Sequence, residues 1–187
     1  EGSMLKLLCD VDLGSGTIDA GSGRFTLDLG GFSLKGSVSY ELILVSSSTA
    51  DIIIKNGKLV NTASVTSGTL NFAIVMYLRA GKVTLDNVDL AGGYAGSDGK
   101  QQSYSIYIDG GELTVVDSSF TGAIYVRKDT LESTIKLKIT SATFNNGIVY
   151  RGVINVGGEY EKYWQAVEAF FADGSVLLDP DGKYIDV

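Results

Sequence analysis

Apolar and polar residues alternate in a set of short segments that recur along the chain. The segments read DIIIKNGKL from Asp51, KVTLDNVDL from Lys82, ELTVVDSSF from Glu112 and TIKLKITSATF from Thr134, and an earlier copy, RFTLDLGGFSL, begins at Arg24. A period of two residues is typical of a β-strand with one buried face. The pattern therefore predicts a strand in each copy.

The spacing of these copies predicts that they stack. The second residues of four copies are Ile52, Val83, Leu113 and Ile135, at intervals of 31, 30 and 22 residues, and the copy at Arg24 begins 27 residues before the next. A repeat of this length without a helix between the strands is typical of a parallel β-solenoid, in which each coil returns one layer higher. We therefore expect the apolar residues of each copy to point inward and to lie above one another.

A second family of strands precedes several of these copies. FAIVMYLRAG, YSIYIDGG and AIYVRKD align on Leu78, Ile108 and Val126, and glycine-rich corners follow the first two of these strands. Two strands per repeat, joined by corners, describe one coil. The sequence therefore predicts an all-β protein with a single right-handed parallel β-helix over residues 4–158, where the handedness follows the general preference for right-handed parallel crossovers. A β-sandwich of short strands with glycine turns is the structural alternative.

One corner position carries an amide or acid side chain in three successive copies. Asn56, Asn87 and Asp117 each stand two residues after an apolar residue that we expect to point inward. Such side chains, stacked at one level, can hydrogen-bond along the solenoid and to the backbone of the turn. The pattern favours a polar ladder, and three independent turn residues are the alternative.

The two ends of a solenoid need caps because end coils expose apolar residues and unpaired strand edges. Residues 159–187 are expected to form the C-terminal cap, as a helix over 159–172 followed by a hairpin. Four apolar or aromatic residues have the spacing of one helical face: Tyr160, Trp164, Val167 and Phe171. At the other end, MLKLLCDVDL predicts the first strand, with Val11 and Leu13 starting the inner stack, and residues 1–3 read as an expression scar.

Composition narrows the classes of function. The chain has 187 residues, of which 44% are hydrophobic, enough to build a packed core and to exclude a disordered chain. A net charge of −7 without a basic block argues against nucleic acid as a partner, and the lack of a long apolar run argues against membrane insertion. The absence of histidine removes the commonest general base and an imidazole zinc ligand. Cys9 lies in an apolar run, and we expect it to be a small buried hydrophobe.

The carboxylates do not form an evident catalytic or metal site. Outward acids have lysines as neighbours in other coils, namely Asp28, Asp86 and Asp89 beside Lys55, Lys58 and Lys138. Alternation of acid and base along a sheet face is better explained by cross-strand charge pairing than by catalysis. Asp179 and Asp181 lie in a DPDGK turn that lacks the further ligands of a calcium loop. The sequence thus predicts no catalytic residue, no metal and no cofactor.

Two segments resemble a known superfamily. FTLDLGGFSLKG resembles the first-coil motif of the pectate-lyase-like right-handed β-helix superfamily, which usually reads LDLNGHTIxG, with Gly30-Gly31-Phe32 standing in place of Asn-Gly-His. The segment from ATFNNG to the end of the chain is similar to the C-terminal part of β-helix modules in large surface proteins of gut Firmicutes. The resemblance implies the fold, but it leaves the activity open, because the superfamily includes lyases, hydrolases, tailspikes and non-catalytic adhesins.

The second strand family carries the candidate binding site. Residues between the expected inward positions form an outer row of tyrosines flanked by a charged row: Tyr77, Tyr107 and Tyr125 beside Arg79, Asp109 and Arg127. Leu44 and Val149 are expected to continue the tyrosine row, and Arg151 the charged one. Three interpretations stay open, namely stacking that stabilises the sheet, a carbohydrate or peptide platform, and a surface that docks a protein.

These observations favour a non-catalytic module of a cell-surface or secreted bacterial protein. On this hypothesis the chain binds a host protein or glycan, or serves as a rigid spacer, within a larger extracellular or surface protein. The missing histidine and the aromatic row without an acid cluster favour it, together with the resemblance. The alternative is a polysaccharide lyase or glycoside hydrolase, or a fragment of one, acting on acidic polysaccharide.

Overall fold

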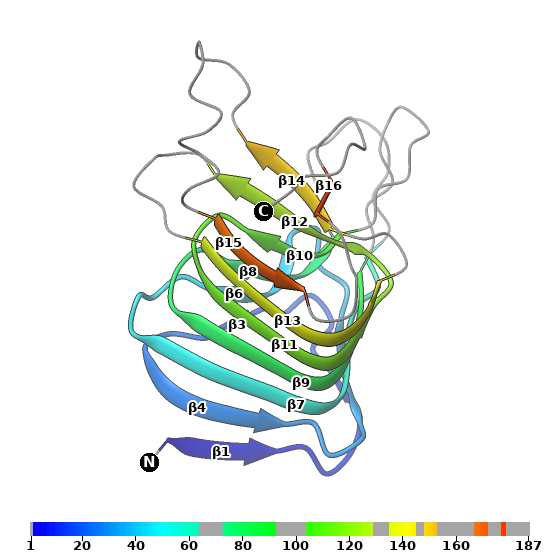
Figure 1. Ribbon diagram of the computed structural model, residues 1–187. Helices are drawn as coiled ribbons and strands as arrows, with labels where there is room; N and C mark the ends of the chain where they lie inside the picture. The colour runs from blue at the N-terminus through cyan, green and yellow to red at the C-terminus, as the bar shows by residue number, and fades with distance from the viewer. Residues whose placement is uncertain are drawn as a thin grey trace, which may run out of the picture.

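The chain folds as a parallel β-solenoid. The computed structural model describes residues 2–63, 73–92, 104–128, 135–144, 148–152, 167–171 and 177–178. Within these residues the protein is all-β, and its strands pair in parallel into two sheets that stack layer upon layer (Figure 1). The predicted parallel β-helix is therefore confirmed, and the β-sandwich is excluded because its strands would pair antiparallel.

The larger sheet, sheet A, holds the first strand family. Its strands lie in the order β1 (Ser3–Lys6), β4 (Gly23–Asp28), β7 (Ala50–Asn61), β9 (Lys82–Ala91), β11 (Gly111–Phe120), β13 (Ile135–Phe144) and β15 (Val167–Phe171). Two short strands complete it: β5 (Ser33–Gly36) pairs with β7, and β2 (Val11–Asp12) pairs with β5. Figure 1 shows the long strands of this sheet as a stack that begins with β1 at the N-terminus.

The second sheet, sheet B, holds the other strand family. Its order is β3 (Ile18–Asp19), β6 (Glu41–Val45), β8 (Ile74–Leu78), β10 (Tyr104–Ile108), β12 (Ala123–Lys128), β14 (Ile148–Gly152) and β16 (Leu177–Leu178). Each strand pairs in parallel with the equivalent strand of the next coil. As a result, residues far apart in the sequence become vertical neighbours.

Aliphatic residues fill the interior in vertical columns. Ile52 pairs with Val83, Val83 with Leu113, and Leu113 with Leu137, and each is at most 1% exposed. The expected partner of Leu113 was Ile135, so the predicted alignment of β13 was wrong by two residues. A shift of two residues keeps the same side chains on the inner face, because side chains alternate with a period of two.

A left-handed residue in each of β7, β9 and β11 turns the chain and resets this alternation. Asn56, Asn87 and Asp117 have φ values of 58°, 55° and 45°, in a region that asparagine and aspartate tolerate better than most residues. In β9 the buried residues are Val83, Leu85, Val88 and Leu90, and Val88 directly follows the left-handed Asn87. The left-handed residue thus lets two successive side chains face outward before the inward pattern resumes.

The first segment departs from its predicted structure. MLKLLCDVDL forms two strands, β1 and β2, which pair with β4 and β5 respectively. The break between them includes Leu8 and Cys9, and Cys9 is exposed, so its predicted burial was wrong. The backbone N–H of Ser33 donates to the Asp10 carboxylate at 2.8 Å, which fixes this break as a corner of the coil. Val11 does start an inner column, because it pairs with the buried Leu34.

The expected C-terminal helix is replaced, over its last part, by strand. Val167–Phe171 forms β15, which pairs in parallel with β13, and Leu177–Leu178 forms β16, which pairs in parallel with β14. The helix predicted over 159–172 is therefore wrong for 167–171. The remaining parts of the predicted cap, helix and hairpin alike, lie outside the described residues.

Candidate functional site

Parallel pairing in sheet B places the three predicted tyrosines in one column. Tyr77 of β8 pairs with Tyr107 of β10, which pairs with Tyr125 of β12. Leu44 precedes them and Val149 follows them in the same column, as the sequence predicted. We call Tyr77, Tyr107 and Tyr125 the tyrosine column. These tyrosines lie on the outer face of sheet B, because the residues before and after them point inward. Met76 and Leu78 flank Tyr77, Ile106 and Ile108 flank Tyr107, and all four are 0% exposed.

The rings of the tyrosine column pack against one another. The ring centroids of Tyr77 and Tyr107 lie 4.8 Å apart in an edge-to-face arrangement at 74°, and those of Tyr107 and Tyr125 lie 5.0 Å apart at 37°. These are distances at which aromatic pairs attract one another. Tyr107 and Tyr125 are each 7% exposed, whereas Tyr77 is half-buried. Most of the surface of the column is therefore used within the protein itself.

Two charged residues, Asp109 and Arg79, contact Tyr77 at the N-terminal end of the tyrosine column. The hydroxyl of Tyr77 donates a hydrogen bond of 2.5 Å to Oδ2 of Asp109, and the exposed guanidinium of Arg79 lies 5.5 Å from the centroid of the Tyr77 ring. An arginine over an aromatic face is a favourable cation–π arrangement. Burial raises the pKa of the Tyr77 phenol well above its usual value, and the hydrogen bond to Asp109 raises that pKa further. Tyr77, Arg79 and Asp109 thus form one connected polar group.

Arg127, the remaining predicted site residue, lies in β12 two residues after Tyr125. It pairs with Arg151 of β14, as expected for the charged row. Its side chain lies outside the described part of the chain. The structure therefore brings the predicted residues into two adjacent rows, and it shows direct contact for Tyr77 with its neighbours Tyr107, Asp109 and Arg79.

The Asn56–Asn87 step of the predicted polar ladder is present at the corner of sheet A, and the ladder extends from Asn56 in the direction of the N-terminus. The amide of Asn87 donates to Oδ1 of Asn56 at 3.3 Å, and the amide of Asn56 donates to Oδ1 of Asp28 at 3.2 Å. The N–H of Gly30, followed by the Asn56 amide, lowers the pKa of the Asp28 carboxyl below its usual value. The sequence predicted lysine neighbours for Asp28, and Lys55 is one of them, but it did not predict the place of Asp28 in the ladder.

The buried polar residue Asn61 was not predicted from the sequence. Asn61, at the end of β7, is 5% exposed and ties three carbonyl groups through its amide: those of Val38, Tyr40 and Ile74. Its Oδ1 accepts from the N–H of Val38 at 3.1 Å. A buried amide needs such partners because an unpaired one is costly. Its inward position, two residues after the buried Leu59, is the signal that could have revealed it.

Outward charges of sheet A form ion pairs between coils, as predicted. A column along this face reads Arg24, Asp51, Lys82, Glu112, Lys136 and Glu168, with alternating sign at every step. Arg24 contacts Asp51 at 2.8 Å, and Lys82 contacts Glu112 at 3.3 Å. Lys58 and Asp89 form a further pair at 3.9 Å, one of those expected from the sequence. We call the six residues the charge ladder.

Among the described residues, no group of three or more side chains of the types that bind metal comes together. The secondary structure of the same residues includes no helix that is long and apolar enough to cross a membrane.

The pairing pattern defines a class of protein, the parallel β-solenoids, with an aromatic column on one sheet and a charge ladder on the other. Comparison of the chain with protein-family models, with curated proteins and with solved structures found no match.

Proposed function

We propose that the chain is a rigid, non-catalytic spacer module of a cell-surface or secreted protein. The observation that carries this proposal is the use of the tyrosine column as internal packing, with Tyr107 and Tyr125 each 7% exposed. Stacked rings, the polar corner ladder and the charge ladder all run along the solenoid axis and link neighbouring coils. Such vertical contacts resist bending between layers, which is what a spacer requires.

A distance measurement between spin labels tests the rigidity of the module. Cys9 is the one cysteine of the chain and is exposed, and Lys138→Cys supplies a second exposed label site on β13. β13 lies five layers from β1, so the labels should be separated by about 24 Å along the axis. Protein diluted with unlabelled chain should give one narrow distance distribution. A broad or multimodal distribution would contradict a rigid spacer.

Binding of a host protein or glycan is the second candidate function, and the arrangement around Arg79 favours it. Arg79 is exposed and lies over the ring of the half-buried Tyr77, while Asp109 holds the phenol. Aromatic faces and arginine forks are common contacts for sugars and for protein hot spots. If this surface binds, a glycan array and a serum-protein pull-down should detect a ligand that Arg79→Ala loses.

Lys136→Ala is the matched control for that experiment, because Lys136 is an exposed cation on the other sheet. Loss of binding in Arg79→Ala with retention in Lys136→Ala would assign the ligand to sheet B. Equal behaviour of the two variants, or no ligand at all, would count against this second function.

The relation to the pectate-lyase-like superfamily, and to surface modules of gut Firmicutes, belongs to the same proposal. It is supported by the parallel stacking and by the glycine corner that follows Leu29, where Gly30 and Gly31 have φ values of 63° and 87°. A lyase or hydrolase acting on acidic polysaccharide is the competing class. Release of unsaturated sugars or reducing ends from a polysaccharide panel would contradict the non-catalytic proposal.

A further inference from the structure

One of the left-handed corners of sheet A carries an Asn-Gly sequence. Asn56 is followed by Gly57, whereas Asn87, which has a similar left-handed φ in the next coil, is followed by Val88. In an Asn-Gly pair the backbone nitrogen of the glycine can attack Cγ of the asparagine, because glycine has no side chain to obstruct the approach and adopts a wide range of backbone conformations. The branched side chain of valine restricts both. Of these two asparagines, Asn56 is therefore the chemically reactive one.

The fold holds the groups that this reaction would have to move. The side-chain amide of Asn56 donates to Oδ1 of Asp28 at 3.2 Å, and its Oδ1 accepts from the amide of Asn87 at 3.3 Å. The peptide group that contains the attacking nitrogen is fixed as well, because the carbonyl oxygen of Asn56 accepts from the N–H of Gly31 at 2.7 Å. The side chain and the peptide group therefore cannot turn toward each other until these hydrogen bonds break.

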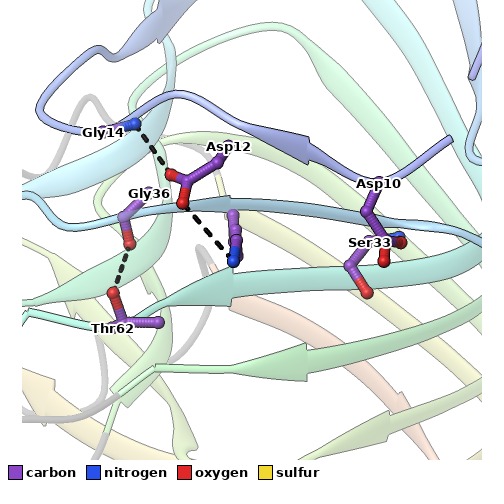
Figure 2. Close-up of polar contacts among 7 residues, drawn as sticks. Asp10, Asp12, Gly14, Ser33, Gly36 and Thr62 are labelled. Atoms are coloured by element: carbon purple, nitrogen blue, oxygen red, sulfur yellow. Dashed lines mark hydrogen bonds and ion pairs between the residues drawn. The ribbon is translucent and has the colours of Figure 1, made fainter.

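The acceptor of the Asn56 amide is itself held in place. Oδ1 of Asp28 also accepts from the N–H of Gly30, two residues later, at 3.0 Å. Figure 2 shows the same arrangement one coil earlier, where the carboxylate of Asp12 accepts from the N–H of Gly14 at 2.9 Å. Both glycines have a left-handed φ, of 63° and 57°. Because Asp28 is fixed by its own corner, opening of the Asn56 corner breaks a contact between two coils.

The corner does not accommodate either product of the reaction. A Cβ on Gly57 would meet the carbonyl oxygen of Phe32 and lie 2.5 Å from Cβ of Leu29, so the backbone here lies directly against the preceding coil. Isoaspartate at position 56 adds a methylene group to this crowded backbone. Aspartate fits the backbone, but it has no N–H to donate and places a second carboxylate against that of Asp28. Both products therefore weaken the contact between the coils.

We propose that Asn56 is a deamidation site that the folded corner protects, so that its modification records opening of the corner. In the open corner the nitrogen of Gly57 bonds to Cγ of Asn56, the bond from Cγ to the side-chain nitrogen breaks, and that nitrogen takes up the proton of the attacking N–H and leaves as ammonia. Water then opens the cyclic imide at either carbonyl carbon, which gives aspartate or isoaspartate. Asn56 and Gly57 are both partly exposed, so water reaches them.

Peptide mapping by mass spectrometry tests this inference on the folded chain and on the chain in guanidinium chloride, at one pH and temperature. Asn56 should be modified more than about tenfold faster in the unfolded chain, because opening of the corner must come first in the folded one. Asn87 is the internal control, with the same corner conformation but a valine after it, and it should stay unmodified in both samples. A second Asn-Gly pair, at 146–147, lies outside the described residues and is followed as a separate peptide.

Variants of the two partners of Asn56 test the protection itself. Asp28→Ala removes the acceptor of the Asn56 amide and should speed its modification in the folded chain by about two- to tenfold. Asp28→Asn is the matched control, because it keeps an Oδ1 acceptor, and its rate should equal that of the unchanged chain. Asn87→Gly removes the donor to Asn56 at an exposed position while it allows the left-handed φ, and it should also speed the reaction. Circular dichroism shows which variants are folded.

The aspartate product can be made directly as Asn56→Asp. This variant should unfold at a lower urea concentration than the unchanged chain, and addition of Asp28→Asn should recover most of the loss, because the exchanged amide can again donate to the facing carboxylate. Equal rates of modification at Asn56 in the folded and unfolded chains, a rate in the unfolded chain no higher than that of Asn87, or an Asn56→Asp variant as stable as the unchanged chain would each overturn the inference.

Discussion

At the scale of single residues, backbone conformation and ring packing decide what each side chain can do. Asn56 turns the chain because asparagine tolerates a left-handed φ, and the same residue links the coils through its amide. Tyr107 lies between two other rings, so we expect its side chain to stabilise the fold more than it contributes to ligand binding. The spacing in the sequence predicts that Asn56 and Tyr107 have equivalents in neighbouring coils. It does not predict which contacts their side chains make or how far those side chains are buried.

Replacement of Asn56 separates its two roles. Asn56→Gly keeps the left-handed φ and removes the hydrogen bonds to Asp28 and Asn87. Asn56→Ala removes the same bonds and adds the strain of a left-handed residue with a Cβ, so it should be less stable than Asn56→Gly by about 1 kcal/mol. Urea unfolding of the two variants measures the difference. Equal stability would show that the left-handed corner is not formed in solution.

Truncation of Tyr107 is expected to destabilise the fold. Tyr107→Ala removes two ring contacts from a side chain that is 7% exposed, and it should lower the free energy of unfolding by about 3–5 kcal/mol. Tyr107→Phe retains the ring and should lose much less. Thermal and urea unfolding compare the two. If Tyr107→Ala melts like the unchanged protein, the column is a surface feature and the spacer proposal loses its main support.

The phenol of Tyr77 makes stability depend on pH in the alkaline range. Burial and the Asp109 carboxylate raise the pKa of Tyr77 in the folded state, so the folded chain retains this proton more strongly than the unfolded chain does. The stability gained is complete below the usual tyrosine pKa of about 10 and falls as the pH rises above that value. Tyr77→Phe should reduce this fall. Unfolding curves that change with alkaline pH in the same way for both chains would contradict the assignment.

At the scale of strands, period-two patterns predicted β4, β7, β9, β11 and β13 of sheet A and β8, β10 and β12 of sheet B. The alignment of Leu78 with Ile108 and Val126 was right because those copies are similar in length and each ends at a corner. The partner of Leu113 was misplaced because β13 starts at Ile135 and pairs there with Gly111, which was not counted as strand. Such an end of a strand depends on which backbone groups find partners, and the local pattern does not specify them.

Ambiguity between helix and strand explains the error at the C-terminal end. In VEAFF, the residues Val167 and Phe171 fit one helical face, but they also fit alternating positions of a short strand. Pairing with β13 satisfies the backbone of this segment and makes it a strand. The repeat spacing that predicted the core also predicted that the three tyrosines form one column. The exposed fraction of their rings could not be predicted, because it depends on how the rings pack in the folded chain.

The charge ladder gives a prediction at the scale of the sheet. Lys82→Glu places an acid between Asp51 and Glu112 and should lower stability by about 1 kcal/mol, an effect that added salt reduces. Lys138→Glu is the control, because Lys138 is exposed and pairs with Thr114 rather than with an acid. Urea unfolding at low and high salt distinguishes them. Equal losses in the two variants would contradict the pairing between coils.

At the scale of the whole molecule, one geometric rule underlies the spacer proposal. Residues about one repeat apart in the sequence lie above one another, so cores, rings and charges accumulate as columns. Disulfide trapping tests this rule most directly.

In a Cys9→Ser background, Thr84→Cys combined with Thr114→Cys places two thiols on paired residues of β9 and β11, about 5 Å apart. Thr84→Cys combined with Lys138→Cys places them in the same column but two layers apart, at about 10 Å, which is too far for a disulfide. Oxidation should therefore close an intramolecular disulfide in the first pair and not in the second. An open first pair, or a closed second pair, would contradict the stacked solenoid.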